Sequence, residues 1–437
     1  MHDIPAFGNA RIANRCVLVG VDFGKPGFTD NIEEMRLLSS SAGADVVAQN
    51  LCRRAKIDAA SFIGSGKALE IASLIEQYEA DLVLFAHALS PAQQRNLENI
   101  FKVRVVDRVA LILDIFALRA QSHEGKLQVE LAQLQHLSTR LVRMWSHLER
   151  QRGGIGMRGP GESQLEMDKR IIGDKIRALK ERLEKLRKQR KTQRRGRARA
   201  GVLTVSVVGY TNAGKSTLFN QLTKANTFAA DQLFATLDTT SRQLYVESNA
   251  HNEAGSGYNI VLTDTVGFIR ELPTTLVAAF RATLEEALNA DLLLHVIDMA
   301  SPERDAHIAQ VNQVLANIGV QHIPQVWVLN KADLLGLPAK MDSDAVVDEP
   351  LRDGMDTDTV TTITLSAKTG DGIGLLRQTL ANIAAMHQAS AGVSVDVSAS
   401  VSTRFLTHSS THSSTQNLTP LPAVLYEKHH DKNVQLT

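Results

Sequence analysis

The sequence contains little cysteine and no long apolar run, and each shortage excludes a class of protein. Only two cysteines occur among the 437 residues, so no disulfide framework is implied and a reducing compartment fits. No run approaches the ~18 apolar residues that a membrane-spanning helix needs. The first residues also lack the basic and apolar regions of a signal peptide. We therefore expect a cytoplasmic protein without a membrane span. This expectation is compatible with transient association with a membrane.

The net charge is close to zero, but the charges are unevenly distributed. Lys and Arg number 48 and Asp and Glu 47, which gives a net charge of +1. Between residues 186 and 200, however, there are eight Lys or Arg and no acid. Such a run is usually a solvated helix face or a linker, yet in a near-neutral chain it also suits nucleic-acid phosphate. Few aromatic residues interleave with it, so we expect backbone contact more than base stacking.

The motif with the clearest chemistry lies at residues 209–217. It follows an apolar run at 202–208 and precedes another at 218–222, which is the order strand, glycine loop, helix. In that order, backbone N–H groups and a helix N-terminus can surround a polyphosphate. Lys215 would reach the β- and γ-phosphates, and the Ser216 hydroxyl would bind Mg²⁺. The residues expected at this phosphate loop are Gly209, Tyr210, Thr211, Asn212, Ala213, Gly214, Lys215, Ser216 and Thr217.

Three later loops each follow a predicted strand. Asp264, after the strand at 260–263, would hold the metal through water, and the Gly267 N–H would meet the γ-phosphate. Asp333, after the strand at 326–329, would accept hydrogen bonds from guanine N1–H and the exocyclic amine, which adenine cannot offer. The other residues expected at the nucleotide are Phe234, Thr265, Val266, Asn330, Lys331, Ser366, Ala367 and Lys368.

Four such loops in this order, each at the carboxyl end of a strand, indicate a GTP-binding domain with a mostly parallel sheet. The first switch loop is expected at residues 233–240, where Thr236 is our choice for a second hydroxyl on Mg²⁺ and Thr239 is the alternative. The predicted metal ligands are thus Ser216, Thr236 and Asp264. The predicted catalytic groups are Lys215, Thr236 and Gly267.

Phe268 occupies the position at which many GTPases have a glutamine that orients the attacking water. A phenyl ring neither accepts nor donates a proton, so intrinsic hydrolysis should be slow, and another part of the protein or a partner must supply the group. The sequence does not select that group. Asn212 has two interpretations: its amide oxygen could coordinate a monovalent cation such as K⁺ that bridges the phosphates, or it could merely tolerate an unusual backbone.

Residues 15–120 alternate short apolar runs with helix-like stretches, which predicts a small parallel sheet with helices on its faces. Within it, residues 64–67 read Gly-Ser-Gly-Lys. They are either a tight turn that opens a helix or an anion or nucleotide site.

Residues 125–200 predict two long helices. Apolar residues recur at helical spacing from Leu127 to Leu148, and a heptad pattern runs from Ile172 to Leu186. Between them lies the glycine-rich stretch 153–161, so we expect an antiparallel helical hairpin with a flexible tip. Arg150, Arg152 and Arg158 make phosphate contact at that tip plausible, and a plain linker is the alternative.

The complete prediction is an α/β protein. A P-loop GTPase domain with a doubly wound, mostly parallel sheet at 201–387 follows a small parallel α/β domain at 1–124 and the hairpin at 125–200. Residues 388–437 are rich in Ser, Thr and His and predict a disordered tail.

Three stretches, 124–133, 153–166 and 264–270, resemble signatures of the HflX family of translation-associated GTPases. The resemblance covers about residues 15–386. It implies a monomer that binds the large ribosomal subunit and its rRNA, docks the hairpin near the peptidyl-transferase region and splits stalled or idle ribosomes. It also implies that the ribosome stimulates hydrolysis, and that some members use ATP through the N-terminal domain to remodel rRNA, for which 64–67 is the candidate turn.

The sequence departs from the family pattern in two places. Thr239 replaces a proline that the family usually has in the first switch, which should make that loop less rigid. The tail does not resemble the small folded module that some members carry. Alternatives to ribosome splitting are ATP- or GTP-dependent rRNA remodelling and a role in ribosome assembly or silencing.

Overall fold

The structure is a computed structural model, and its described residues contain a four-stranded and a seven-stranded sheet. The tail predicted at 388–437 begins in a helix, because residues 388–393 continue α12 (Ile373–Val393), which corrects the prediction of disorder there. Residues from 394 on and most of the predicted hairpin tip, 153–159, lie outside the described residues. In the part of the chain that is described, no helix has the length and hydropathy needed to cross a membrane. The structure describes residues 14–24, 26–144, 160–199, 201–224, 233–234, 236–247, 257–270, 289–346 and 359–393.

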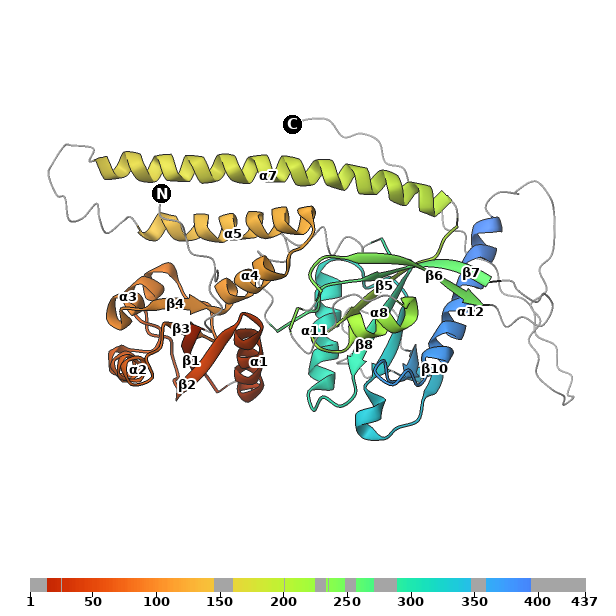
Figure 1. The fold of residues 1–437 in the computed structure, drawn as a ribbon, viewed down its shortest axis with the longest axis horizontal. Coiled ribbons are helices and arrows are strands. Elements are labelled where there is room, and N and C mark those ends of the chain that lie inside the picture. Colours follow the sequence, from red (N-terminus) through yellow and green to blue (C-terminus); the bar gives the residue numbers. More distant parts are fainter. Residues whose placement is uncertain are drawn as a thin grey trace, which may run out of the picture. The chain divides into compact units, whose positions relative to one another are not determined.

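The N-terminal part is a four-stranded parallel sheet with strand order β2-β1-β3-β4 (Figure 1). Alternate residues of β1 face opposite sides, so Leu18 joins one apolar core and Val17 the other. The elements are β1 (Asn14–Asp22), α1 (Phe28–Ser41), β2 (Ala44–Arg53), α2 (Ser65–Gln77), β3 (Leu82–Phe85), α3 (Pro91–Phe101), β4 (Arg104–Asp107) and α4 (Arg108–Arg119).

Helices cover both faces of this sheet, as the alternation of apolar runs predicted. Residues of α1 and α4, such as Met35 and Phe116, lie in the first core, and residues of α2 and α3, such as Ile71 and Leu97, lie in the second. The helix α3 begins with a capping box in which the Gln93 N–H donates to the Ser90 hydroxyl at 3.3 Å.

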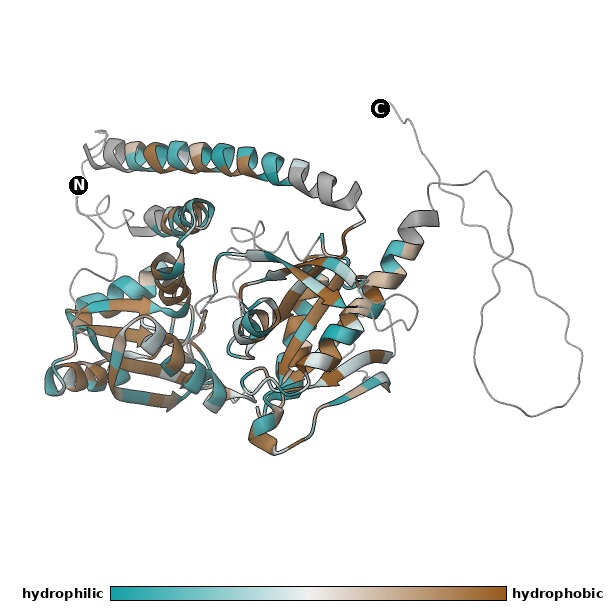
Figure 2. Cartoon of the chain, turned by 45° about the vertical axis from the view of Figure 1, so that its right-hand side comes forward, coloured by the Kyte–Doolittle hydropathy of each residue, from teal (hydrophilic) through white to brown (hydrophobic). Residues whose placement is uncertain are grey.

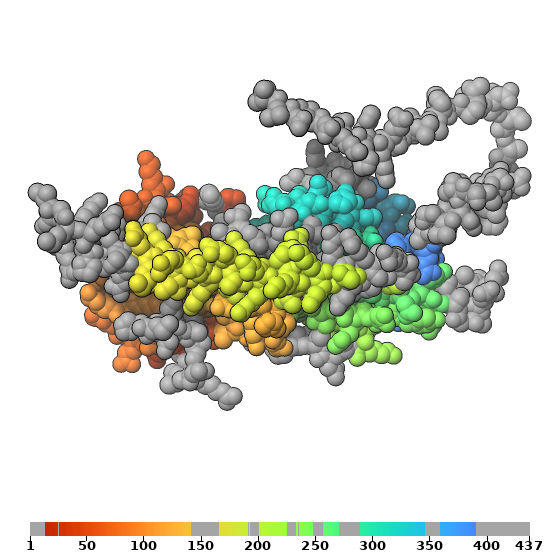
Figure 3. Space-filling model, turned by 90° about the horizontal axis from the view of Figure 1, so that it is seen from above, coloured from red at the N-terminus to blue at the C-terminus, as the bar shows by residue number. Residues whose placement is uncertain are grey.

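Two long helices follow, α5 (His123–Met144) and α7 (Pro160–Arg199). Their seam buries Leu127, Leu131 and Leu179, so the heptad pattern of the sequence is the contact surface between them. An ion pair of 2.7 Å joins Glu124, at the start of α5, to Arg190, near the end of α7, which fixes the pair as antiparallel. In Figure 3 the side chains of α7 form a continuous yellow ridge along the described helix.

The C-terminal part is a seven-stranded sheet with strand order β10-β11-β9-β8-β5-β7-β6. Its inner pairs are parallel, and the two outer pairs, β6–β7 and β10–β11, are antiparallel. The elements are β5 (Thr204–Gly209), α8 (Lys215–Thr223), β6 (Thr240–Glu247), β7 (Gly257–Asp264), β8 (Leu292–Asp298), α11 (Arg304–Asn317), β9 (Gln325–Asn330), the 3-10 helix η1 (Ala332–Leu335), β10 (Lys340–Val346), β11 (Thr359–Thr364) and α12 (Ile373–Val393).

Apolar side chains concentrate on the inner strands of this sheet, which are brown in Figure 2. Helices α8 and α12 cover one face, where Phe219 and Leu380 are buried, and α11 covers the other, where Leu315 is buried. The doubly wound parallel sheet predicted from the sequence is therefore confirmed. All four predicted nucleotide loops follow β5, β7, β9 and β11, whose carboxyl ends lie at one edge of the sheet.

Candidate nucleotide-binding site

The phosphate loop leaves β5 through glycines that no other residue could replace without a shift. Gly209 has a φ of 148°, and a Cβ there would collide with the Val296 carbonyl oxygen of the neighbouring strand. Gly214 has a φ of 94°, in the left-handed region, where it forms the N-cap of α8. The loop therefore turns sharply enough to direct its N–H groups and the first turn of α8 at a single point.

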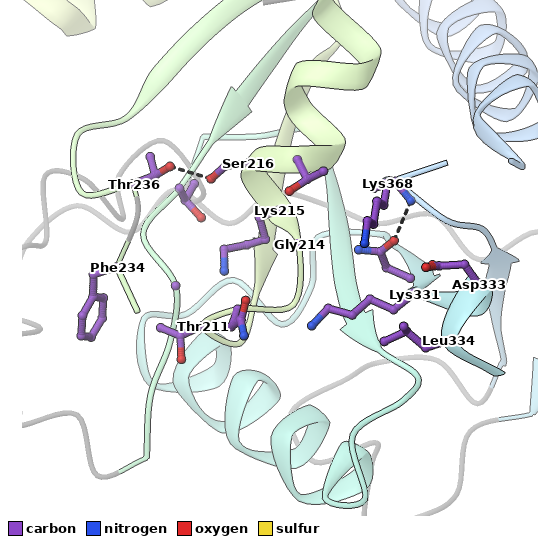
Figure 4. Close-up of a pocket in the computed structure, with 16 residues that line it drawn as sticks. Thr211, Gly214, Lys215, Ser216, Phe234, Thr236, Lys331, Asp333, Leu334 and Lys368 are labelled. Carbon is purple, nitrogen blue, oxygen red and sulfur yellow. Dashed lines mark hydrogen bonds between the residues drawn. The ribbon is translucent and has the colours of Figure 1, made fainter. Parts of the chain in front are cut away.

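A cavity of about 460 Å³ opens above this loop (Figure 4). Leu334 lines it and was not predicted, although it directly follows the Asn330–Asp333 motif. The expected residues that line the cavity are Thr211, Asn212, Gly214, Lys215, Ser216, Thr217, Phe234, Thr236, Thr265, Gly267, Asn330, Lys331, Asp333, Ala367 and Lys368. The expected residues that do not line it are Gly209, Tyr210, Ala213, Asp264, Val266 and Ser366.

Tyr210 illustrates why some expected residues lie behind the cavity wall. Its hydroxyl donates to Glu34 of α1 at 2.5 Å, and its ring stacks on His307 at a centroid distance of 3.8 Å. Only its backbone faces the site, where its carbonyl oxygen accepts a hydrogen bond from Lys215 Nζ at 2.7 Å. The Tyr210 side chain therefore links the phosphate loop to α1. Only the Tyr210 backbone is placed to contact a nucleotide.

Lys215 places a buried cation at the centre of the cavity. The residue is 6% exposed. Burial lowers the pKa of Lys215 to about 8, and the nearby carboxylate of Asp264 partly offsets that effect. A polyphosphate in the cavity would supply the negative charge that this buried ammonium group lacks. Gly267 also lines the cavity. There is no room for a side chain at this position, because a Cβ would lie 2.9 Å from Lys215 Nζ.

Three oxygen-bearing side chains converge beside the lysine. The hydroxyls of Ser216 and Thr236 are 2.6 Å apart (Figure 4). Ser216 Oγ also donates to Asp264 Oδ2 at 2.8 Å. The other oxygen of Asp264, Oδ1, is buried and has no hydrogen-bond partner among the described residues. Burial raises the pKa of Asp264, opposed mainly by Lys215. Such a set of hard oxygen donors with an unsatisfied carboxylate oxygen fits Mg²⁺.

Asn330 joins the phosphate side of the cavity to the base side. Its Nδ2 donates to the Ala213 carbonyl oxygen at 2.8 Å, and its Oδ1 accepts from the Ala367 N–H at 2.9 Å. Asp333 is oriented in turn by Ser366, whose hydroxyl donates to Asp333 Oδ1 at 2.6 Å. Ser366 therefore acts through Asp333 and need not line the cavity itself. The arrangement fixes the orientation of a carboxylate that lines the cavity.

Phe268 points away from the cavity. Its ring is 1% exposed and belongs to the apolar core, while its backbone pairs with Gly209 and Thr211. It therefore offers no group to the water at the γ-phosphate. Asn212 lines the cavity with a φ of 61°. That left-handed backbone agrees with the second interpretation of Asn212 and leaves room for the first.

The turn at residues 64–67 is the N-terminus of α2. Gly64 has a φ of 81°, and Lys67 Nζ forms an ion pair with Glu70 at 2.8 Å. Both observations fit a tight turn that opens a helix. The turn also borders a shallow cavity of about 540 Å³. The basic residues that line it are Arg53, Arg54, Lys56 and Lys67.

The sheet, its four loops and the cavity define a P-loop GTPase. Family models agree: "GTP-binding GTPase N-terminal" matches residues 29–117, "GTP-binding GTPase Middle Region" matches 119–197, and "50S ribosome-binding GTPase" matches 204–331. The chain is 50% identical over 367 residues to the GTPase HflX of Escherichia coli (strain K12), covering 84% of this chain and 82% of that one. The chain belongs to the HflX family of GTPases.

A second relative, from another bacterium, agrees with this assignment. The GTPase HflX of Magnetococcus marinus is 47% identical over 343 residues, which cover 78% of this chain and 75% of that one. A GTP-binding protein from Sulfolobus solfataricus, solved in complex with GDP, is 23% identical with a TM-score of 0.45, covering 85% of this chain and 99% of that one. The chain is thus a GTP-binding enzyme that hydrolyses GTP to GDP and phosphate.

Proposed function

We propose that this GTPase binds the large ribosomal subunit and uses GTP binding and hydrolysis to split stalled or idle ribosomes in the cytoplasm, acting as a monomer. The observation that carries the proposal is the antiparallel pair α5 and α7, of which the second ends in the basic run just before β5. A long basic hairpin attached directly to the strand that leads into the phosphate loop is suited to contact rRNA phosphate. The name of the matching family model, "50S ribosome-binding GTPase", supports the same partner.

In this proposal the cavity residues have separate tasks. Lys215 binds the β- and γ-phosphates, and the Gly267 N–H binds the γ-phosphate. Ser216 and Thr236 would hold Mg²⁺ directly and Asp264 through water. The metal would neutralise charge between the β- and γ-phosphates. Asp333, oriented by Ser366, selects guanine.

Hydrolysis then needs a group that Phe268 does not supply. We propose that the ribosome either provides this group or orders one of the chain's own. A monovalent cation at Asn212 would assist by neutralising phosphate charge. Turnover in potassium compared with turnover in sodium tests the cation directly, and equal rates would remove it from the mechanism.

Ribosome splitting is tested by light scattering of intact ribosomes mixed with the protein. With GTP or a non-hydrolysable analogue, scattering should fall as subunits separate, and with GDP it should not. The Lys215→Ala variant, which cannot hold the phosphates, serves as the inactive control. Binding to large subunits without any loss of intact ribosomes would favour an assembly or silencing role instead.

A second candidate function is ATP-driven rRNA remodelling by the N-terminal part. The basic cavity beside α2 favours it, because Arg53 and Lys56 on its wall are exposed and could meet phosphate. ATP turnover should then persist in a Lys215→Ala background and fall when Arg53 and Lys56 are both changed to Glu. If Lys215→Ala alone abolishes ATP turnover, this second function is excluded.

A further inference from the structure

Asp238 lies two residues after Thr236 in the first switch loop, and its carboxylate contacts the start of α5. Asp238 Oδ2 accepts hydrogen bonds from the backbone N–H groups of Gln121 and Ser122, each at 2.7 Å. Asp238 Oδ1 accepts one from the Ser122 hydroxyl at 2.6 Å. A carboxylate at a helix N-terminus is favoured by the helix dipole, and hydrogen bonds to a charged acceptor are among the stronger ones.

Gly125 shows how closely the carboxylate approaches the helix. It lies in the first turn of α5, where its N–H donates to the Ser122 hydroxyl at 2.8 Å. A Cβ at this position would overlap Asp238 Oδ1 at less than a van der Waals distance. Glycine is a poor helix former, yet here its missing side chain leaves the space that the carboxylate occupies.

Three other described residues of the first switch loop also contact N-terminal helices or their core. The Leu233 N–H donates to the Ser41 hydroxyl of α1 at 3.1 Å. The Phe234 ring meets Phe116 of α4 edge-on, with centroids 4.6 Å apart. Leu237 is 2% exposed in the same apolar core. The loop thus contacts α1, α4 and α5 while Thr236 lies at the predicted metal site.

Because Leu237 alone lies between them, Thr236 and Asp238 cannot move independently over long distances. Two residues span at most about 7 Å when fully extended. If Thr236 leaves Ser216 by several ångströms, the backbone will pull on Asp238, whose three hydrogen bonds are all close to 2.7 Å. The metal site and the first turn of the hairpin therefore share one short segment of chain.

We propose that Asp238 is a positioning residue that couples the nucleotide state to the helical hairpin. By holding the first switch against α5, it favours the position of Thr236 at Mg²⁺ and so favours GTP over GDP. By reciprocity, bound GTP strengthens the attachment of α5, and hydrolysis weakens it. This inference rests on the proposed role of Thr236 as a metal ligand.

The test uses the full chain and two variants that break the contact from opposite sides. Asp238→Ala removes the carboxylate, and Gly125→Ala fills its space while improving the helix propensity of α5. Gly173→Ala is the matched control, since it makes the same change within α7, where a Cβ would meet nothing within 4 Å. Affinities for GDP and for a non-hydrolysable GTP analogue are measured at fixed Mg²⁺ concentration.

We expect both variants to lose roughly tenfold in affinity for the GTP analogue, within the usual range of coupling between two sites, and to keep their affinity for GDP. Gly173→Ala should change neither. Hydrogen exchange gives a second measurement. The amides of residues 121–125 should be protected more by the GTP analogue than by GDP, and a purely structural role of Asp238 would give no such difference. That difference should vanish in Asp238→Ala.

Two results would overturn the proposal. One is a folded Gly125→Ala protein with an unchanged preference for the GTP analogue, and the other is equal protection of residues 121–125 by both nucleotides. The Thr236→Ala variant distinguishes a failure of the proposed coupling from a failure of the proposed metal site. If Thr236→Ala keeps the preference for the GTP analogue, the role of Thr236 is wrong. If it loses the preference while Gly125→Ala keeps it, only the coupling is wrong.

Discussion

Replacing Asp333 with Asn should change which base the enzyme accepts. In the structure Ser366 donates to Asp333 Oδ1 at 2.6 Å, and an asparagine could keep that bond through its own oxygen. Its Nδ2 group would then face the exocyclic amine of guanine, so a donor would meet a donor. Xanthine has a carbonyl oxygen in place of that amine and would accept the new hydrogen bond.

The magnitude follows from the bond that is lost. Guanine gives the Asp333 carboxylate two hydrogen bonds, and a bond to a charged group contributes about 1.5–3 kcal/mol. Loss of the bond to the exocyclic amine therefore costs about 1.5–3 kcal/mol of binding free energy, or roughly 10–10² in affinity for GTP. Affinity for the xanthine nucleotide should rise, because the variant amide pairs with the carbonyl.

The assay is competition between GTP and the xanthine nucleotide for a fluorescent guanine nucleotide on the folded variant. Asp305→Asn is the control, since Asp305 is exposed on α11 and forms an ion pair with the neighbouring Arg304 at 2.9 Å. Ser366→Ala should weaken GTP binding without any gain for xanthine, because it removes only the orientation of the carboxylate. The reasoning is refuted if Asp333→Asn binds GTP as tightly as the wild type.

Three further changes have expected outcomes. Asn330→Ala removes the link between Ala213 and Ala367 and leaves a buried N–H and carbonyl unpaired. Urea denaturation should therefore show a loss of about 2–4 kcal/mol in the free energy of unfolding. A loss below about 0.5 kcal/mol would contradict this role of Asn330. Phe268→Gln should lower the free energy of unfolding by about 3–5 kcal/mol. It should not accelerate GTP turnover, because the side chain at this position is buried in the core. Faster turnover would contradict the inward orientation of this side chain. Burial lowers the pKa of Lys215 to about 8, and bound phosphate should raise it, so nucleotide affinity should be full below that pH and decline above it. Calorimetry in two buffers at pH 8 should detect proton uptake on binding, and its absence would count against the shift.

The sequence was most informative where local chemistry and strand order agree. The phosphate loop depends on contacts between residues close in the chain, and the structure contains it between β5 and α8. The heptad pattern likewise located the seam between α5 and α7. Each of these elements has a periodicity or a required residue type that short-range physics imposes.

Other elements had no such signal. The strand β10 reads Lys-Met-Asp-Ser-Asp-Ala-Val, a polar stretch typical of a loop, and becomes a strand because it pairs with β11. The helix α4 has no clear periodic signal, because its buried residues Leu111, Ile112 and Phe116 leave no clear polar side. The bond between Tyr210 and Glu34 joins residues 176 positions apart. Only the folded arrangement of the chain brings such partners together.

The central claim is that the ribosome completes a site at which Phe268 supplies no water-positioning group. It is tested most directly by GTP turnover with and without purified large ribosomal subunits, at matched magnesium and potassium concentrations. The account predicts a rise of at least about tenfold with large subunits. An unchanged rate, with tight GTP binding intact, would contradict the account and would mean that the basic hairpin binds some other partner.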